Sequence, residues 1–198
     1  MAMQPGDFQD LVFSKRERSF SMESDQELIE LANKGDPDAF EALYHRHRDW
    51  VYRLAWRFTG NRTDALDALQ ETFTYLLGKF PGFELTASMT TFLYPVVKHV
   101  SSTIRAKRSQ VTSVEGEFDE LCAPKFVESD HYRAELTAVL RVLVDEQREV
   151  LLMRFVDGMS LQEIAAALDI PLGTVKSRLH NALRALRSDS RTRDYFLE

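Results

Sequence analysis

Hydrophobic residues recur at intervals of three and four through the first half of the chain, the spacing that places them along one side of an α-helix. The longest stretch follows Asp36-Pro37, an N-cap residue with proline at the first helical position, and continues to Gly60. A short helix is expected before it, capped by Asp25 and ended near Lys34 by Gly35. No stretch has the alternating pattern of a half-buried strand, so the pattern predicts helices.

Two more helices are predicted before residue 109. The first is expected to be capped by Thr63 and to stop at Pro81-Gly82. The second is expected to begin at Ser88. It contains Pro95, whose missing N–H predicts either a kink or a helix that starts only a few residues earlier. The apolar positions expected on the buried face of the first of these helices are Leu66, Leu69, Phe73, Leu76, Leu77 and Phe80.

The helical period is lost between Ser109 and Asp130, where acidic residues are combined with Gly116 and Pro124. This composition predicts a linker, after which the period resumes near Ser129. The chain is therefore expected to be all-α, with two small helical domains joined by a flexible acidic linker. The expected divisions are an N-terminal extension at 1–22, a first domain at 23–108, the linker at 109–130 and a second domain at 131–193.

The second domain carries the most informative pattern. A helix capped by Asp145 is expected to reach Gly158, and Ser160 with Glu163 forms a capping box that opens a short helix. A tight turn at 169–171 then leads into a last helix. Its apolar face is expected to hold Leu172, Val175, Leu179, Leu183 and Leu186, and its opposite face Thr174, Lys176, Ser177, His180, Asn181 and Arg184. This order is typical of a helix-turn-helix, whose second helix enters the major groove. The alternative is a plain helical hairpin with solvated cations.

Charge first argues against nucleic acid, because 25 Lys and Arg against 31 Asp and Glu give a net charge of -6. The distribution changes that picture. Residues 98–110 hold four basic residues and no acidic one, and residues 170–193 hold six basic residues and one acidic residue. Between them, residues 111–132 hold one basic and six acidic residues. The pattern predicts two separate surfaces that face anions, and it excludes only indiscriminate coating of DNA.

Cysteine usage and hydropathy bear on the cellular compartment. The single cysteine, Cys122, cannot form an internal disulfide, and residues 1–10 lack a basic patch followed by an apolar run. The best local apolar run, 92–97, is about a quarter of the roughly 20 residues that a membrane span needs. We therefore expect a cytoplasmic protein without a membrane partner.

The second domain resembles region four of bacterial sigma factors, in particular the small two-domain group called extracytoplasmic-function (ECF) sigma factors. The matching residues are the run 147–152, Phe155, Gly158, Ser160, the run 163–165, Ile170-Pro171 and the run Gly173 to Leu179, which reads GTVKSRL. In the first domain, residues 64–73 read DALDALQETF and resemble the region-two motif DAEDLVQETF of the same family. The two resemblances cover about residues 24–108 and 133–188.

The resemblance implies a dissociable initiation factor of RNA polymerase that performs no covalent chemistry and needs no cofactor. Its first domain would bind the clamp coiled coil of core polymerase and the opened minus-ten promoter element. Its second domain would bind the polymerase flap and read the minus-thirty-five element as duplex. The residues implied for polymerase binding are Asp64, Asp67, Gln70 and Glu71, whose acidic and amide face suits a basic partner helix.

The run 91–94 reads TFLY and resembles the family's TWLY at the start of the helix that meets the minus-ten element. Aromatic residues beside cations suit an opened strand, because bases stack and the phosphate backbone is neutralised. The residues implied there are Tyr94, Lys98, His99, Arg105, Lys107 and Arg108, whereas Phe92 is expected to pack in the core. Pro95, His99 and Thr103 depart from the family's usual Arg, Asn and Asp, so the preferred bases at this element are left open.

For the minus-thirty-five element, the implied residues are Thr174, Lys176, Ser177, Arg178, His180, Asn181 and Arg184, with Arg178 and Arg184 expected on phosphate. Asn181 stands where the family commonly has Arg. Because asparagine suits adenine and arginine suits guanine, this replacement predicts an altered element. Regulation is left open between an anti-sigma factor, the N-terminal extension and the acidic linker.

Two other functions compete with this interpretation. One is a helix-turn-helix transcriptional regulator that does not exchange on polymerase. The other is an enzyme with a metal held by Glu41, His45, His47 and His99. His45 and His47 lie two apart, so on one helix they face different directions, which is not the spacing of a helical zinc motif. No metal site is therefore expected.

Overall fold

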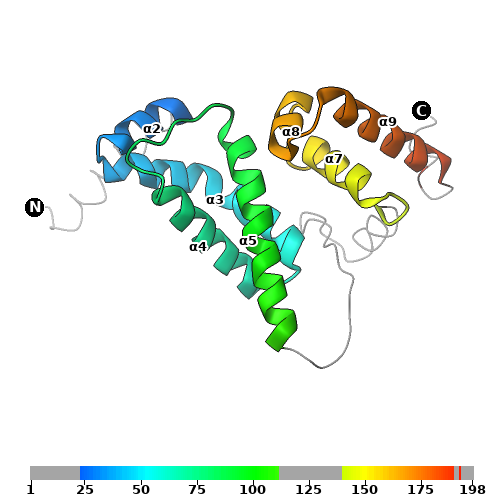
Figure 1. Ribbon diagram of the computed structural model, residues 1–198, viewed down its shortest axis with the longest axis horizontal. Coiled ribbons are helices and arrows are strands. Elements are labelled where there is room, and N and C mark those ends of the chain that lie inside the picture. Colours follow the sequence, from blue (N-terminus) through cyan, green and yellow to red (C-terminus); the bar gives the residue numbers. More distant parts are fainter. Residues whose placement is uncertain (1–22, 112–139, 190–191, 193–198) are drawn as a thin grey trace, which may run out of the picture. The chain divides into compact units, whose positions relative to one another are not determined.

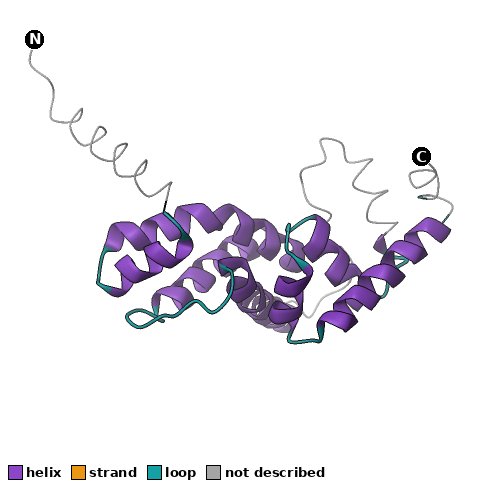
Figure 2. Cartoon of the chain, turned by 90° about the horizontal axis from the view of Figure 1, so that it is seen from above, coloured by secondary structure: helices purple, strands orange, loops and turns teal. Residues whose placement is uncertain are grey.

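The computed structural model describes residues 23–111, 140–189 and 192 (Figure 1). Within these residues every regular element is a helix, as the sequence predicted (Figure 2). In chain order the helices are α2 (Asp25–Asn33), α3 (Pro37–Thr59), α4 (Arg62–Leu77), α5 (Met89–Val111), α7 (Asp145–Phe155), α8 (Leu161–Leu168) and α9 (Leu172–Ser188). The expected N-terminal extension, nearly all of the linker with Cys122, and the start of the second domain lie outside the described residues.

Packing divides the chain into two compact units. Among the described residues, one unit comprises 23–49 with 73–86, and the other comprises 50–72 with 87–111, 140–189 and 192. Helices α3 and α4 each continue from one unit into the other.

The helix starts agree with the sequence in three places. The Asp36 carboxylate accepts from the Asp38 amide at 3.0 Å, as an N-cap before Pro37 does. The Ser88 hydroxyl accepts from the Thr91 amide at 3.3 Å at the start of α5, and Pro95 falls in the second turn of that helix. The capping box of Ser160 and Glu163 is also present.

Three expected caps are wrong by one or two residues. Helix α2 is capped by Ser24, which forms a capping box with Glu27, so Asp25 is the first helical residue. Helix α4 is capped by Asn61, whose side-chain oxygen accepts from the amides of residues 63 and 64 at 2.8 and 3.1 Å. Helix α7 follows Val144, which gives no side-chain cap, and Asp145 instead lies in the first turn, where a carboxylate is favoured by the helix dipole.

The first unit is closed by a polar clamp on the loop after α4. The side-chain oxygen of Asn33 accepts from the amides of Gly82 and Phe83 at 2.7 and 3.0 Å. Its nitrogen donates to the Phe83 carbonyl at 2.9 Å. The core of this unit includes Leu28 and Ile29 of α2, Ala39 and Leu43 of α3, and Leu76 of α4, all essentially without exposure. A single asparagine thereby ties α2 to the start of the loop before α5.

In the second unit, α7, α8 and α9 form a three-helix group in which α7 and α8 both contact α9. One apolar cluster joins these helices to the residues before α7. Its buried members are Leu140, Leu143, Leu151, Leu152, Ala182 and Leu186, with Leu179, Leu183 and Ala185 packed against them. Helix α8 also contacts α5.

Candidate nucleic-acid interface

Helices α8 and α9 form the expected helix-turn-helix. The Ser160 amide donates to the Glu163 carboxylate at 2.8 Å, and the Glu163 amide donates back to the Ser160 hydroxyl at 3.2 Å. Hydrogen bonds from the Ser88 hydroxyl and the Ser160 amide hold the pKa of Glu163 below its usual value. Asp169 takes a left-handed φ of 52°, which lets the Ile170 amide reach the Ala165 carbonyl at 3.0 Å and turns the chain into α9.

The faces of α9 separate as the sequence predicted. Val175 and Leu186 are buried, and Leu179 and Leu183 pack against the apolar cluster of the second unit. On the other side Lys176, Ser177, His180 and Arg184 are exposed, and Thr174, Arg178 and Asn181 are half-buried. All seven residues expected at the minus-thirty-five element therefore retain access to solvent on one helix.

Helix α5 presents a basic second half. Lys98 and His99 near its middle and Arg105, Lys107 and Arg108 towards its end are all exposed. Lys98 donates to the Glu149 carboxylate of α7 at 2.5 Å, and two further cations are tied to α3 and α4. Arg105 donates to the Phe58 carbonyl at 3.1 Å, and Arg108 donates to the Asp64 carboxylate at 2.8 Å. Such contacts fix where a guanidinium lies without consuming all five of its donors.

Tyr94 differs from the other residues expected at the minus-ten element, because its side chain is buried. Only 1% of its surface is exposed, its hydroxyl donates to Glu149 at 2.9 Å, and its ring meets Phe58 edge-on at 6.0 Å between centroids. Burial and the Glu149 carboxylate raise the pKa of Tyr94, so the hydroxyl remains a neutral donor. In this arrangement the ring is not available to stack on a base.

The four residues expected to bind polymerase lie in two different environments. Asp67, Gln70 and Glu71 are exposed on α4. Asp64, in contrast, is paired with Arg108 and its side chain is only 13% exposed. An ion pair therefore links Asp64, which was expected to bind polymerase, to Arg108, which was expected to bind DNA.

The expected buried face of α4 is wrong at two positions. Leu66 and Leu77 are 46% and 53% exposed, and Tyr75 is 46% exposed. The buried side is instead made by Ala65, Ala68, Thr72, Phe73 and Leu76. Ala65 and Ala68, which lie three residues apart, are on the side of α4 that packs closely against the core. The sequence prediction had instead placed the larger Leu66 and Leu77 on that side. Three apolar side chains thus lie among the exposed acidic and amide residues of α4, which the sequence had not indicated.

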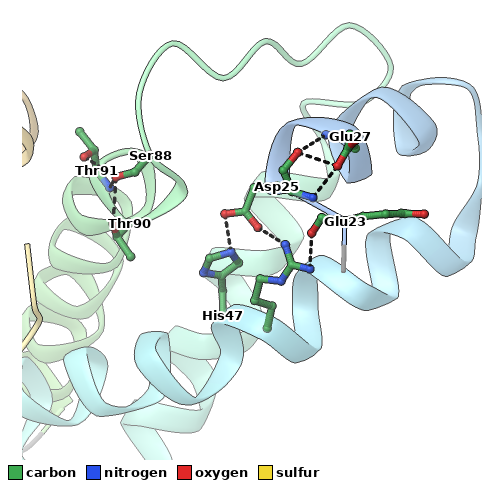
Figure 3. A network of polar contacts seen from close by, with 9 residues as sticks. Glu23, Asp25, Glu27, His47, Ser88, Thr90 and Thr91 are labelled. Carbon is green, nitrogen blue, oxygen red and sulfur yellow. Dashed lines mark hydrogen bonds and ion pairs between the residues drawn. The ribbon is translucent and has the colours of Figure 1, made fainter. Parts of the chain in front are cut away.

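Three of the four candidate metal ligands, Glu41, His45 and His47, make other contacts. His47 shares Asp25 with Arg46: the imidazole lies 3.0 Å from one carboxylate oxygen, and the guanidinium donates to the other at 2.7 Å (Figure 3). His45 lies 3.4 Å from Glu41, and His99 is on α5. Within the described part of the chain no three His, Cys, Asp or Glu side chains are grouped to hold a metal ion.

Asp25 gives a prediction for the dependence of stability on pH. Burial raises its pKa, but the hydrogen bonds and charges of His47 and Arg46 outweigh burial and lower the pKa below 3.8. A depressed carboxylate pKa contributes stability that is present above pH 3.8 and is lost as the pH falls through the folded-state pKa. Denaturant titrations should therefore show a steeper loss of stability below pH 3.8 in the wild type than in Asp25→Asn.

A matched control for this prediction is Asp49→Asn on α3, because the Asp49 side chain is 78% exposed. This variant should keep the slope of the wild type. Equal slopes in Asp25→Asn and the wild type would contradict the role given to the pair with His47.

The comparisons with known proteins agree with both halves of the sequence pattern. Residues 43–110 match the family described as Sigma-70 region 2, and residues 139–188 match the family described as Sigma-70, region 4. The ECF RNA polymerase sigma factor SigW of Bacillus subtilis is 30% identical over 177 residues, which cover 82% of this chain and 95% of SigW. The RNA polymerase sigma-H factor of Pseudomonas aeruginosa is 29% identical over 84% of this chain and 93% of its own length.

Two solved structures share the fold. CnrH, in complex with the cytosolic domain of CnrY, superposes with a TM-score of 0.62 at 22% identity, covering 82% of this chain and 94% of CnrH. The sigma factor RpoE of Bartonella quintana, in complex with the anti-sigma factor NepR, superposes with a TM-score of 0.58 at 23% identity, covering 75% and 94%. Among the described helices, none is long and apolar enough to cross a membrane.

Proposed function

The chain belongs to the family of ECF RNA polymerase sigma factors, and we propose that its helices divide promoter recognition between an opened and a duplex element. As a member of this family it directs promoter-specific initiation of transcription. The alternative of a helix-turn-helix regulator that does not exchange on polymerase is not supported, because the region-two match at 43–110 and the sigma-factor relatives go beyond a DNA-binding domain. The proposed role is one of binding, without covalent chemistry and without a cofactor.

Recognition of the duplex minus-thirty-five element is supported by the solvent-facing side of α9. Lys176, Ser177 and His180 are exposed beside a turn that the capping box of α8 and the left-handed Asp169 hold in place. In a helix-turn-helix the N-terminal residues of the second helix contact base edges. Lys176, Ser177, His180 and Asn181 would contact bases or phosphates, and Arg178 and Arg184 would contact phosphates.

The opened element is assigned to α5. Its exposed cations, from Lys98 to Arg108, can neutralise the backbone of a single strand. Tyr94 joins this set only if the contact between its hydroxyl and Glu149 is broken. The proposed minus-ten surface therefore consists of the exposed cations of α5. Tyr94 is added to it only in a conformation in which its side chain has left Glu149.

Core polymerase is proposed to bind the exposed side of α4. Asp67, Gln70 and Glu71 supply acidic and amide groups there, while Leu66 and Leu77 supply apolar area. Mixed surfaces of this kind suit a partner helix, because charge sets the orientation and apolar contact contributes affinity. Asp64 would act indirectly, by holding Arg108 on α5.

An anti-sigma factor is the proposed regulator of the free protein. Support comes from the solved structure of RpoE, whose fold this chain shares and which is bound to the anti-sigma factor NepR. The N-terminal extension and the acidic linker remain the alternative regulators.

Transcription in vitro from a randomised promoter library with core polymerase tests the proposed function directly. We expect transcripts that depend on the added protein and that enrich two separated sequence elements upstream of the start. Transcription that is unchanged by the protein would contradict the proposal. Enrichment of only one element would contradict the division between α5 and α9.

Lys176→Ala tests the contact of α9 with DNA. If Lys176 neutralises a phosphate, the variant releases one counterion fewer on binding, so the slope of log affinity against log salt should fall by about one unit. Binding of holoenzyme to promoter fragments over a range of salt concentrations measures that slope. Lys34→Ala, at the exposed C-cap of α2, is the matched control and should leave it unchanged. Unaltered slope and affinity in Lys176→Ala would remove the proposed role.

A further inference from the structure

The solvent-facing side of α4 combines half-exposed leucines with acidic and amide groups. Leu66 and Leu77 are 46% and 53% exposed, and their separation of about three helical turns places them on the same side of α4. Asp67, Gln70 and Glu71 are exposed between them. We call these five residues the α4 face. Exposed apolar side chains that are rimmed by polar groups mark surfaces on which another segment or protein packs.

The charge of the α4 face is acidic. Over residues 62–77 the helix holds three acidic residues and one basic residue. Asp64 is already neutralised, because Arg108 donates to its carboxylate at 2.8 Å. Asp67 and Glu71 are therefore the carboxylates that α4 presents to solvent. A segment that fits this face needs apolar side chains for the leucines and cations for the two carboxylates.

The N-terminal extension contains a sequence with this combination. Residues 8–18, which lie outside the described residues, read FQDLVFSKRER. Apolar and then basic residues follow the spacing i, i+3, i+4, i+7 and i+8, namely Phe8, Leu11, Val12, Lys15 and Arg16. On an α-helix this spacing would gather the five side chains on one side, whereas Asp10 and Glu17 would face the other way. The sequence of residues 8–18 thus complements the α4 face in hydrophobicity and in charge.

The lengths of the two partners also agree. As a helix, residues 8–18 would measure about 16 Å, which is about the distance along α4 from Leu66 to Leu77. Residues 19–23 join this segment to the start of α2, and five residues can span roughly 17 Å. Helix α2 is about 14 Å long, and its last residue, Asn33, holds the loop that follows α4. The connection is therefore long enough for residues 8–18 to reach α4 of the same chain.

We propose that residues 8–18 dock on the α4 face of the free protein and that core polymerase must displace them. This step rests on the proposed function, which assigns the same face to core polymerase. A segment tied to its site by a short linker has an effective concentration in the millimolar range, so even a weak contact is populated. Docking lowers the apparent affinity for polymerase, because only the uncovered fraction of the protein can bind.

Paramagnetic relaxation in nuclear magnetic resonance spectra of the full-length protein tests the docking. A spin label is attached at Ser14→Cys, which is off the proposed docking side, in a Cys122→Ser background that removes the native thiol. The label should broaden the amide signals of residues 66–77 in α4 and leave those of α9 sharp. Sharp signals throughout α4 would overturn the proposal.

A mixing experiment distinguishes the chain's own segment from that of a second copy. Spin-labelled protein without isotope label is added to isotope-labelled protein without a spin label, so that broadening reports only contacts between molecules. We expect the α4 signals to stay sharp in this mixture. Broadening as strong as in the single labelled protein would assign the contact to another copy of the chain and would overturn the proposal.

Phe8→Ser should raise the affinity for core polymerase, because it removes an apolar side chain of the docking side. If nine-tenths of the free protein is covered and the substitution weakens docking tenfold, the uncovered fraction rises from about one-tenth to about one-half. The affinity for immobilised core polymerase should then rise about fivefold. The matched control is Phe13→Ser, which removes the same ring from the other side of the segment and should leave the affinity unchanged.

The binding measurement separates this proposal from the proposed function. If neither the wild type nor Phe8→Ser binds core polymerase, the proposed function fails. If the wild type and both variants bind core polymerase with the same affinity, the proposed function stands and the competition by residues 8–18 is overturned.

Discussion

Leu76→Ala should lower the free energy of unfolding of the first unit by about 2–5 kcal/mol, the range measured for truncation of fully buried leucines. Leu76 has no exposed surface in α4, so the substitution removes apolar burial and leaves a cavity that the surrounding helices fill only in part. A domain of this size has roughly 5–15 kcal/mol of stability in total. The midpoint of thermal unfolding is therefore expected to fall by about 10–30 °C.

The neighbouring residue provides the control, because Leu77 is 53% exposed on the same helix. Leu77→Ala deletes the same atoms at a position where they remain largely in water, and its effect should stay within about 0.5 kcal/mol. Far-ultraviolet circular dichroism follows the loss of helix in a denaturant titration, and it gives the midpoint of each variant. Equal midpoints for the two variants would contradict the burial assigned to this face of α4.

That pair of leucines also indicates where the sequence was informative. Helical spacing predicted α4 correctly but assigned its buried face by counting large apolar residues, which included Leu66 and Leu77. In the structure the deepest positions include Ala65 and Ala68, because close helix contacts select small side chains. The period of apolar residues predicts that a helix forms. Which side of the helix faces the core depends on the helices that pack against it, and the local sequence does not contain that information.

Caps show the same division between local and non-local information. Ser24 with Glu27 has the same spacing as Ser160 with Glu163, yet only the second was identified, because Asp25 offered an equally good cap one residue later. The structure resolves the choice through a distant group. Asp25 is used by His47 and Arg46 of α3, which leaves capping to Ser24.

The candidate interface was predictable to the extent that it is a surface of one helix. The outer face of α9 follows from its own periodicity and from the turn before it. The contacts of α5 do not, because Glu149 lies 55 residues from Tyr94 and Asp157 lies 100 residues from Arg57. Such pairs depend on which helices meet, and a single sequence holds no signal for them.

Asp67→Lys combined with Gln70→Ala should weaken binding to core polymerase by about 100-fold, or about 2.7 kcal/mol. Under the proposed function these residues face a basic partner helix, and a lysine in place of the carboxylate sets like charges against one another. Such an arrangement costs several kcal/mol at an interface, and it also slows association by reversing the local attraction. Surface biosensor measurements with immobilised core polymerase give the affinity and both rates.

The matched control is Glu84→Lys, in the loop between α4 and α5, because Glu84 is exposed and the charge changes by the same amount. Its affinity for polymerase should stay within about twofold of the wild type, since a charge away from the interface acts only through a screened field. Asp67 and Gln70 are themselves exposed, so the thermal midpoint of the double variant should stay near that of the wild type. A normal midpoint with undiminished binding would place the polymerase surface elsewhere.

A fall in binding that accompanied a fall in the thermal midpoint would instead indicate loss of the fold, as expected for Leu76→Ala. Comparing Leu76, Leu77 and the Asp67, Gln70 pair on one helix therefore separates residues that hold the fold from residues that contact the partner.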